Sequence, residues 1–236
     1  MGNVRRGGVA LSDLLRLAGP DDGAEYVISA GLDHGVYDSA YHDHYEKDLP
    51  LDKALDGTTL VALAVNGAPL PARRGGPVRL VVPGYYGTNS TKWLTSLTVS
   101  DRRSTGAFTT KYYMDPPADD SAIATPVWEL APNSLLVAPV DEGVHVGRSV
   151  EIWGWAWACE PVTGVDVSVD GGQTWTSAEV TSRTGHAWQR FTLGWTPSSV
   201  GEHILACRAT NRSGATQPSA PRRNRIHQRV VFVTQE

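Results

Sequence analysis

Apolar and polar positions along the first hundred residues alternate between helical and strand spacing. Leu11–Ala18 has a helical period, and Gly19 followed by Pro20 is typical of a helix end. Glu25–Ala30 has the apolar pattern of a short strand. Residues 31–48 show neither period, so we expect a long polar loop there.

The next segments carry local start and turn signals. Pro50 suits the first turn of a second helix, for which Asp48 is the expected N-cap. The strand Leu60–Val65 and the apolar segment from Leu70 flank Asn66-Gly67, a type I′ turn signal.

Two further strands complete this half of the chain. They are Val78–Val82, a β-branched run, and Leu94–Val99. Short helices mixed with short strands predict an α+β domain over residues 1–110.

The pattern changes after residue 110. Residues 111–126 contain Asp-Pro-Pro, Asp-Asp and Thr-Pro, a composition that favours a linker. From residue 127 to 236, short alternating apolar runs are separated by Gly and Pro, which predicts an all-β, immunoglobulin-like sandwich. The expected strands are Leu135–Ala138, Val150–Trp157, Val165–Val169, Ala187–Leu193, His203–Ala209 and Arg229–Val233.

Composition excludes several classes of partner. The net charge of −4 gives no electrostatic case for nucleic acid or an anionic membrane surface. No apolar run is long enough to span a membrane, and the first residues do not have the apolar core of a secretory signal. The order Cys159, Trp175, Cys207 resembles the Cys–Trp–Cys signature of immunoglobulin domains. Pairing of the two cysteines stays open, and we favour free thiols.

Two motifs suggest a specific function but also have an ordinary structural explanation. His42 and His44 stand among carboxylates and tyrosines, a set that can ligate a metal, but a solvated loop near a cleft explains them better. Residues 168–175 match the Asp-box hairpin of sialidase propellers. Because a propeller repeats such a motif and this chain has it once, Asp170 and its neighbouring glycines are read as turn formers.

The stretch from Arg79 to Trp93 carries the strongest candidate chemistry. A β-branched strand leads into Pro83-Gly84 and a loop rich in Gly, Asn and Ser, which ends at Lys92 and Trp93. Small residues allow backbone N–H groups to approach a ligand closely, and Arg79 and Lys92 bracket the loop with positive charge. This distribution suits an anionic group such as a phosphate. The alternative is that both cations are solvated surface charges.

The same stretch, R-x-V-V-P-G-x-x-G-x-x-x-x-K-W, resembles the molybdopterin-binding segment of the sulfite oxidase family. Three upstream segments are similar to family motifs in the same order: Gly7–Leu15, Tyr45–Ala54 and Leu63–Leu70. Residues 127–236, with Val167–Trp175, resemble the family's dimerisation domain. The resemblance implies Mo-molybdopterin as cofactor, oxygen-atom transfer to sulfite or a similar small oxyanion, a homodimer through residues 127–236, and an electron-acceptor protein as a possible partner.

The resemblance also assigns roles to individual residues. Tyr45 falls where the family places an active-site tyrosine. The cofactor-binding residues it implies are Arg79, Gly84, Ser90, Thr91, Lys92 and His34. Asn224–Arg229 is similar to the family's N-x-x-H-R, which implies substrate binding by His227 and Arg229. Gln228 stands where the family has arginine, and this departure weakens the case for sulfite itself.

The family's molybdenum ligand is a cysteine in a C-A-G-N-type motif a few dozen residues before the segment that begins at Gly7. Only six residues precede Gly7 here, so we expect these 236 residues to lack that ligand. Neither Cys159 nor Cys207 is a replacement, because both lie in the predicted sandwich. Two functions therefore stay open: a molybdenum oxidoreductase in a truncated form, or a non-catalytic two-domain module for dimerisation.

Overall fold

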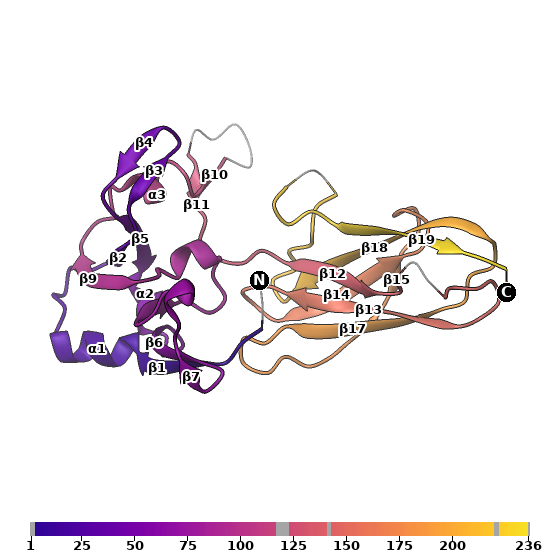
Figure 1. Cartoon of the computed structure of the whole chain (residues 1–236), viewed down its shortest axis with the longest axis horizontal. Helices are drawn as coiled ribbons and strands as arrows, with labels where there is room; N and C mark the ends of the chain where they lie inside the picture. Colours follow the sequence, from indigo (N-terminus) through magenta and orange to yellow (C-terminus); the bar gives the residue numbers. More distant parts are fainter. Residues whose placement is uncertain (1–2, 117–122, 141–142, 220–221, 236) are drawn as a thin grey trace. The chain divides into compact units, whose positions relative to one another are not determined.

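The computed structural model describes residues 3–116, 123–140, 143–219 and 222–235 (Figure 1). The chain divides into two compact units, Met1–Trp128 and Glu129–Glu236. Within the predicted linker 111–126, residues 117–122 lie outside the described part, and the flanking pieces pair as two short strands.

The first unit contains two antiparallel sheets, as expected for an α+β domain. In one sheet β2 lies between β5 and β9, and in the other β6 pairs with β1, β7 and β8. Their bounds are β1 Arg6–Ala10, β2 Tyr26–Gly31, β5 Tyr45–Pro50, β6 Leu60–Val65, β7 Ala68–Pro69, β8 Arg79–Val81 and β9 Leu94–Ser100. Asn66 and Gly67 both have positive φ, 51° and 81°, so the predicted tight turn after β6 is confirmed.

Two helices cover the core of this unit. Helix α1 (Leu11–Ala18) ends as predicted, because Gly19 adopts a left-handed conformation and its N–H bonds to the Leu15 carbonyl. Helix α2 spans Leu51–Leu55. The two helices and both sheets bury one apolar cluster: Leu11, Leu15, Val27, Leu49, Ala54, Leu80 and Val82.

The N-cap assigned to Asp48 is wrong. Asp48 lies within β5 and is buried, and the residue that precedes α2 is Pro50, which makes no side-chain cap. Arg103 binds the Asp48 carboxylate through Nε at 2.7 Å and Nη2 at 3.1 Å. A bidentate guanidinium is a stronger partner than backbone N–H groups, so a residue 55 positions away decides the local structure.

Residues 31–48 are also more ordered than expected. Strands β3 (Gly35–Tyr37) and β4 (Ala40–His42) form a hairpin that extends beyond β2 and β5 (Figure 1). Its Tyr37 ring contacts Phe108 at 5.7 Å and Tyr112 at 4.7 Å between centroids. These contacts come from α3 (Ala107–Thr110) and the chain just after it, and they hold the hairpin in place.

Short elements connect these parts. They are the 3-10 turns η1 (Ala72–Arg74) and η2 (Gly87–Asn89), and the paired strands β10 (Met114–Asp115) and β11 (Thr125–Pro126). Among the described residues, no helix is long and apolar enough to cross a membrane.

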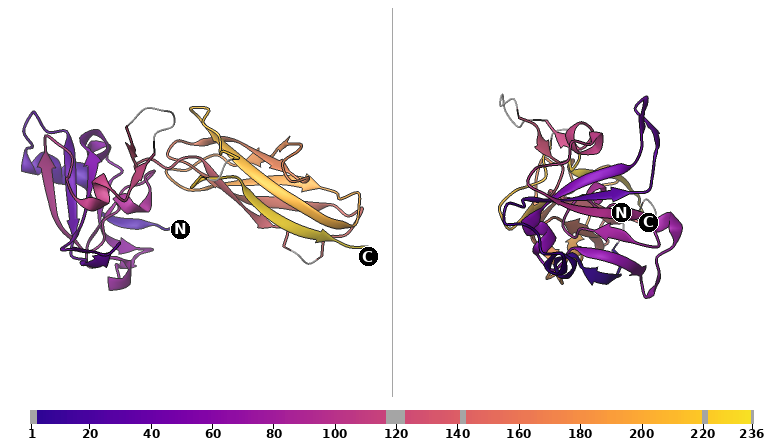
Figure 2. Two further views of the ribbon diagram at one scale, coloured as in Figure 1. Left: turned by 90° about the horizontal axis from the view of Figure 1, so that it is seen from above. Right: turned by 90° about the vertical axis from the view of Figure 1, so that its left-hand side faces the viewer.

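The second unit is the predicted β-sandwich (Figure 2). One sheet has the order β12-β13-β17-β16 and the other β15-β14-β18-β19. Strand β13 has the bounds predicted for it, and Ile152, Phe191, Leu205 and Val231 lie fully buried between the sheets. The strands are β12 Asn133–Ala138, β13 Val150–Trp157, β14 Val162–Ser168, β15 Thr176–Ser177, β16 Glu179–Val180, β17 Gln189–Trp195, β18 Gly201–Asn211 and β19 His227–Val233.

Candidate functional site

Arg79 connects the loop 83–93 to the chain that precedes it. Its Nη1 donates to the Arg74 carbonyl at 2.9 Å, its Nη2 to the Ser90 carbonyl at 2.6 Å and its Nε to the Leu80 carbonyl at 3.2 Å. The Ser90 hydroxyl accepts the Val82 N–H at 3.1 Å, and Gly84 turns the chain at φ +82°. The main role of Arg79 and Ser90 is therefore structural: both hold the loop conformation by hydrogen bonds to backbone groups.

Lys92 and Trp93 are clamped at the far end of this loop. Trp93 has φ +46°, an unusual value for an aromatic residue, and its indole N–H donates to the Ala72 carbonyl at 2.8 Å. A Cβ on Gly75 would lie 2.6 Å from Lys92 Cβ, and one on Gly31 would lie 2.6 Å from the Lys92 carbonyl oxygen. Glycine at both positions allows the two backbone segments to pack closely against Lys92. This packing fixes the position of the Lys92 backbone and Cβ.

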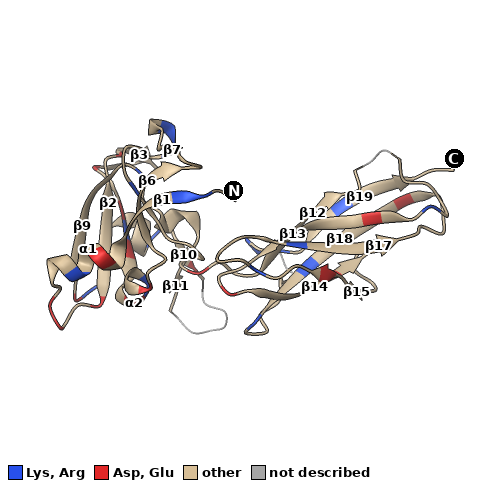
Figure 3. Cartoon of the chain, turned by 90° about the horizontal axis from the view of Figure 1, so that it is seen from below, with Lys and Arg blue, Asp and Glu red and all other residues tan. Residues whose placement is uncertain are grey.

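Basic side chains gather around this loop. We name Arg6, Arg74, Arg79 and Lys92 the basic cluster. Within the described ranges, none of the four forms an ion pair with Asp or Glu. Burial, then the charges of Arg6 and Arg74, lower the pKa of Arg79 to about 10. Blue segments mark the basic residues of β1 and those near β7 in Figure 3.

Arg6 has a buried guanidinium nitrogen, Nη1, that the described protein atoms leave without a hydrogen-bond partner. Burial and the charge of Arg74 lower the pKa of Arg6. A buried guanidinium N–H without an acceptor is unfavourable, so the cluster is suited to binding an anionic group.

The hydroxyl groups of Tyr45 and Thr91 are hydrogen-bonded to other protein groups. The Tyr45 hydroxyl donates to the Thr88 carbonyl at 2.6 Å, and burial, followed by Tyr113 and Asp33, raises its pKa far above the usual value. Thr91 is buried and its hydroxyl shares a 2.7 Å hydrogen bond with Ser29. The roles predicted for both stay predictions, and their hydroxyl groups are already engaged.

A small cavity of about 150 Å³ lies beside Tyr45, and we call it the hairpin cavity. Asp33 Oδ1 and His42 Nε2 line it, and both atoms are buried without a hydrogen-bond partner. His34 also lines it; its exposed ring donates from Nδ1 to the Leu32 carbonyl at 3.2 Å. The lining residues are Asp33, His34, Gly35, Val36, Tyr37, His42, His44, Tyr45 and Phe108.

Sequence reasoning missed Phe108 and Tyr113. The Phe108 ring lies 4.7 Å from that of Tyr45 and 6.4 Å from that of Tyr113. Tyr113 is half-buried; burial and then Tyr37 raise its pKa, and no hydrogen bond of its hydroxyl is found within the described ranges. The available signal was the aromatic residues Phe108, Tyr112 and Tyr113, two of which fall within the predicted linker 111–126.

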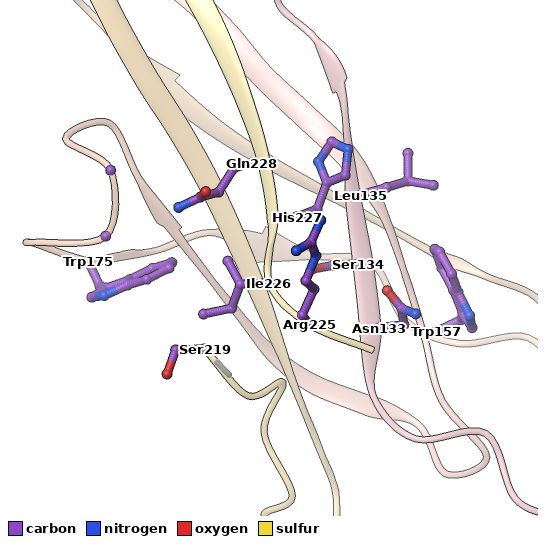
Figure 4. A pocket seen from close by; sticks show the side chains of 12 residues that line it. Asn133, Ser134, Leu135, Trp157, Trp175, Ser219, Arg225, Ile226, His227 and Gln228 are labelled. Carbon is purple, nitrogen blue, oxygen red and sulfur yellow. The ribbon is translucent and has the colours of Figure 1, made fainter. Parts of the chain in front are cut away.

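The predicted substrate residues lie in the other unit. A cavity of about 590 Å³ in the sandwich is lined by His227, Gln228, Arg225, Trp157 and Trp175, among others (Figure 4). Since His227 Nδ1 accepts the Leu136 N–H at 3.2 Å, a neutral ring carries its proton on Nε2. Burial, then Arg229, lower the His227 pKa and favour that neutral form.

Arg229 does not line this cavity. Its guanidinium donates to the carbonyls of Val137 at 2.8 Å and Pro139 at 3.1 Å, so it fixes the end of β12. The positions of the two units relative to one another are not determined, so His227 and Tyr45 are not placed in one site.

Metal ligands are sparse. Across the described part of the chain, no group of three or more His, Cys, Asp or Glu is arranged to hold a metal ion, His42 and His44 included. Cys159 and Cys207 are not joined in a disulfide, and both lie in the sandwich unit. Burial raises the pKa of Cys207 to about 12, which disfavours the thiolate.

Comparisons with known proteins agree on one family. Residues 1–108 match the oxidoreductase molybdopterin binding domain, and residues 124–228 match the Mo-co oxidoreductase dimerisation domain. Mitochondrial sulfite oxidase of Mus musculus is 33% identical over 233 residues, covering 91% of this chain and 42% of the relative. Sulfite oxidase of Gallus gallus is 32% identical, covering 92% and 50%.

One solved structure and one further relative extend this result. The sulfane dehydrogenase SoxCD of Paracoccus pantotrophus superposes with a TM-score of 0.80 at 28% identity, covering 99% of this chain and 63% of that one. Nitrate reductase [NADPH] of Fusarium oxysporum is 30% identical over 193 residues, covering 73% of this chain and 21% of the relative. The chain thus spans half or less of the length of these curated relatives. With both of its units matched in order, the chain belongs to the sulfite oxidase family of molybdopterin-binding oxidoreductases.

Proposed function

We propose that this chain is part of a molybdenum-cofactor oxidoreductase that transfers an oxygen atom to sulfite or a similar small substrate. The observation that carries the proposal is the basic cluster. Four cations converge on the loop 83–93 with no acidic partner within the described residues, and Arg6 Nη1 is buried without an acceptor. An anionic pterin phosphate would supply the missing charge and hydrogen-bond acceptors.

The residues present fit the cofactor that the family implies. Arg6, Arg74 and Lys92 would hold its anionic group, because none of them forms an ion pair with Asp or Glu among the described residues; the Lys92 Nζ lies 4.1 Å from the centroid of the Trp93 ring. Asp33 Oδ1, also without a partner, would accept hydrogen bonds from ring N–H groups. When bound, the molybdenum and its dithiolene ligand supply the redox chemistry, and the protein contributes orientation and charge.

The chain's own groups divide the remaining work. Arg79, Ser90 and Thr91 shape the loop from within, so their contribution to binding is positional. Tyr45 holds η2 through the Thr88 carbonyl. The Tyr113 hydroxyl has no hydrogen-bond partner among the described residues, so it is the phenol available to hydrogen-bond an oxyanion.

Substrate contacts are proposed for the sandwich cavity. The neutral His227 ring offers an Nε2–H, and Gln228 lines the cavity where the family has a cation. Arg229 supports this wall by fixing β12. Neutral donors bind a dianion less strongly than arginine does, so we propose a substrate related to sulfite and do not restrict it to sulfite.

A second candidate function is a non-catalytic module that dimerises through residues 127–236. It is favoured by one observation: molybdenum prefers a soft thiolate, and both thiols lie in the sandwich unit, with Cys207 held protonated. In either case we propose a homodimer through the dimerisation domain, and for the enzyme an electron-acceptor protein.

Cofactor content distinguishes the two candidates. The 236-residue chain would be produced in a host that makes Mo-molybdopterin, purified, and assayed for pterin and for molybdenum separately. We expect bound pterin with molybdenum well below one atom per chain, because no group of three or more His, Cys, Asp or Glu among the described residues is arranged to hold a metal, and a missing ligand or its support costs at least about 10–100-fold in affinity. Absence of pterin would favour the non-catalytic module, and stoichiometric molybdenum would require a metal ligand among these residues.

A further inference from the structure

Lys47 is a buried lysine without a partner. It is 1% exposed, and its Nζ makes no hydrogen bond in the described structure. Lys53, by contrast, reaches Asp56 at 2.5 Å. Lysines are almost never fully buried unless they are paired, so Lys47 needs an explanation other than stability.

The nearest carboxylate is not available to it. Asp48 is the next residue on β5, but both of its oxygens bind Arg103. Neighbours on a strand also point to opposite faces. Burial therefore dominates and lowers the pKa of Lys47 to about 8, with Asp48 opposing this effect and Arg103 adding to it. At pH 7 the amine is still largely protonated.

Lys47 contacts one tyrosine and shares a strand face with another. It is on the same face of β5 as Tyr45, and its Nζ lies 5.6 Å from the centroid of the Tyr113 ring. Tyr113 in turn accepts the Val127 N–H at its carbonyl, at 3.0 Å, which fixes its backbone. A cation over the face of a phenol orients the ring and withdraws charge from its hydroxyl.

Unpartnered polar atoms are concentrated in the same region. Thr88 Oγ1, Asn89 Oδ1 and Trp128 Nε1 are buried without partners, as Lys47 Nζ is. They belong to segments that contact one another: Asn89 Nδ2 donates to the Val127 carbonyl at 3.0 Å, and Tyr86 N–H to that of Trp128 at 2.8 Å. Such unsatisfied groups in a native fold mark functional positions.

We propose that Lys47 is a positioning residue: its buried ammonium orients the Tyr113 phenol and strengthens it as a hydrogen-bond donor to an oxyanion. The inference rests on the proposed function for the site, but not on the bound cofactor. Asp48 and Arg103 act on Lys47 through their charges, and Tyr113 contacts it through its ring. Asp48 and Arg103 bind each other, so neither of them pairs with the Lys47 ammonium.

The proposal is tested by titrating the full chain with sulfate. Binding is monitored by NMR through the Cζ signal of Tyr113 in protein with labelled tyrosine. The Tyr113→Phe variant assigns the signal, and the signal distinguishes this phenol from the basic cluster. At pH 7 we expect Lys47→Met to weaken sulfate binding at Tyr113 about 10-fold, which corresponds to weakening one charge-assisted hydrogen bond to the anion by about half. Lys53→Met, the matched control, should bind as the wild type does.

Three further readouts separate positioning from a structural role. Wild-type affinity should fall between pH 7 and 9, whereas that of Lys47→Met should stay flat. Lys47→Met should unfold at the same or a higher temperature than the wild type at pH 7, because it removes an unpaired buried charge. In a Tyr113→Phe background, followed at another tyrosine of the site, Lys47→Met should have little further effect. No saturable sulfate binding at Tyr113, unchanged affinity in Lys47→Met, or a large loss of its stability would each overturn the proposal. None of these outcomes bears on pterin binding, which tests the proposed function.

Discussion

The Arg103–Asp48 pair gives the sharpest stability prediction. The Asp48 side chain is 0% exposed and receives two hydrogen bonds from Arg103, whose own side chain is 28% exposed. Arg103→Ala would leave a buried carboxylate without its cation. Removing one partner of a buried ion pair costs about 3–5 kcal/mol, because the remaining charge is desolvated and uncompensated. We expect that loss here.

Arg102→Ala is the matched control. Arg102 pairs with Asp101 at 3.2 Å, but the two side chains are 81% and 67% exposed. Exposed pairs contribute about 0–1 kcal/mol, so this neighbouring change should be nearly silent. The comparison holds residue type and segment constant and varies only burial.

Calorimetric unfolding of the full chain is the assay, with the transition of the first unit followed by itself. For a unit of this size, about 1 kcal/mol shifts the melting temperature by roughly 3–5 °C, so Arg103→Ala should lower it by roughly 10–20 °C. The double variant Arg103→Ala/Asp48→Asn should recover part of the loss, since it also removes the buried charge. If Arg103→Ala is as silent as the control, or if Asp48→Asn restores nothing, the electrostatic reasoning is refuted.

Three other predictions concern charge and assembly. The pKa of Lys47 is lowered to about 8 from 10.5. Between these values the unfolded chain binds a proton that the folded chain does not, so unfolding free energy should rise by up to ~3 kcal/mol as pH increases through that window. Lys47→Met should lack this rise in urea unfolding at stepped pH, and an identical pH profile in both proteins would contradict the assignment. Asp170 accepts hydrogen bonds from Thr174 and Ser168, which hold its pKa well below the usual value. Asp170→Asn should therefore lower the melting temperature of the sandwich and not that of the first unit. The difference in melting temperature between wild type and variant should disappear as pH falls below about 4. An unshifted sandwich transition would show that the turn needs no carboxylate. The full chain should sediment as a dimer at micromolar concentration, and a monomer there would contradict the proposed homodimer.

Periodic segments were predictable because their apolar pattern reports directly on burial. Helix α1 and strand β13 have the bounds that their sequences indicate. The hairpin β3–β4 was not predictable in this way. Its Val36 and Tyr41 are exposed, and it is held by aromatic contacts with residues about 70 positions later in the chain. The local sequence pattern cannot predict contacts with residues so distant along the chain.

The same limit applies to the site. Motif resemblance located Arg79 and Lys92, yet it could not show that the Arg79 guanidinium is engaged by backbone carbonyls while Lys92 has no acidic partner among the described residues. The sequence predicted Asp48 as a helix N-cap because Pro50 is close to it, whereas its actual partner, Arg103, is distant in sequence. Lys47 gave no signal at all, since burial of a polar residue depends on the folded surroundings.

The central claim is that the basic cluster binds the anionic part of the pterin. Its most direct test is the affinity of the chain for metal-free molybdopterin, measured beside thermal unfolding for wild type and Lys92→Met. A charge-assisted hydrogen bond is worth about 1.5–3 kcal/mol, so we predict an affinity about 10- to 150-fold lower with little change in melting temperature. Lys111→Met, which removes an exposed lysine paired with Asp38, should leave both unchanged. Equal pterin affinity in wild type and Lys92→Met, or no binding by the wild type, would contradict the account.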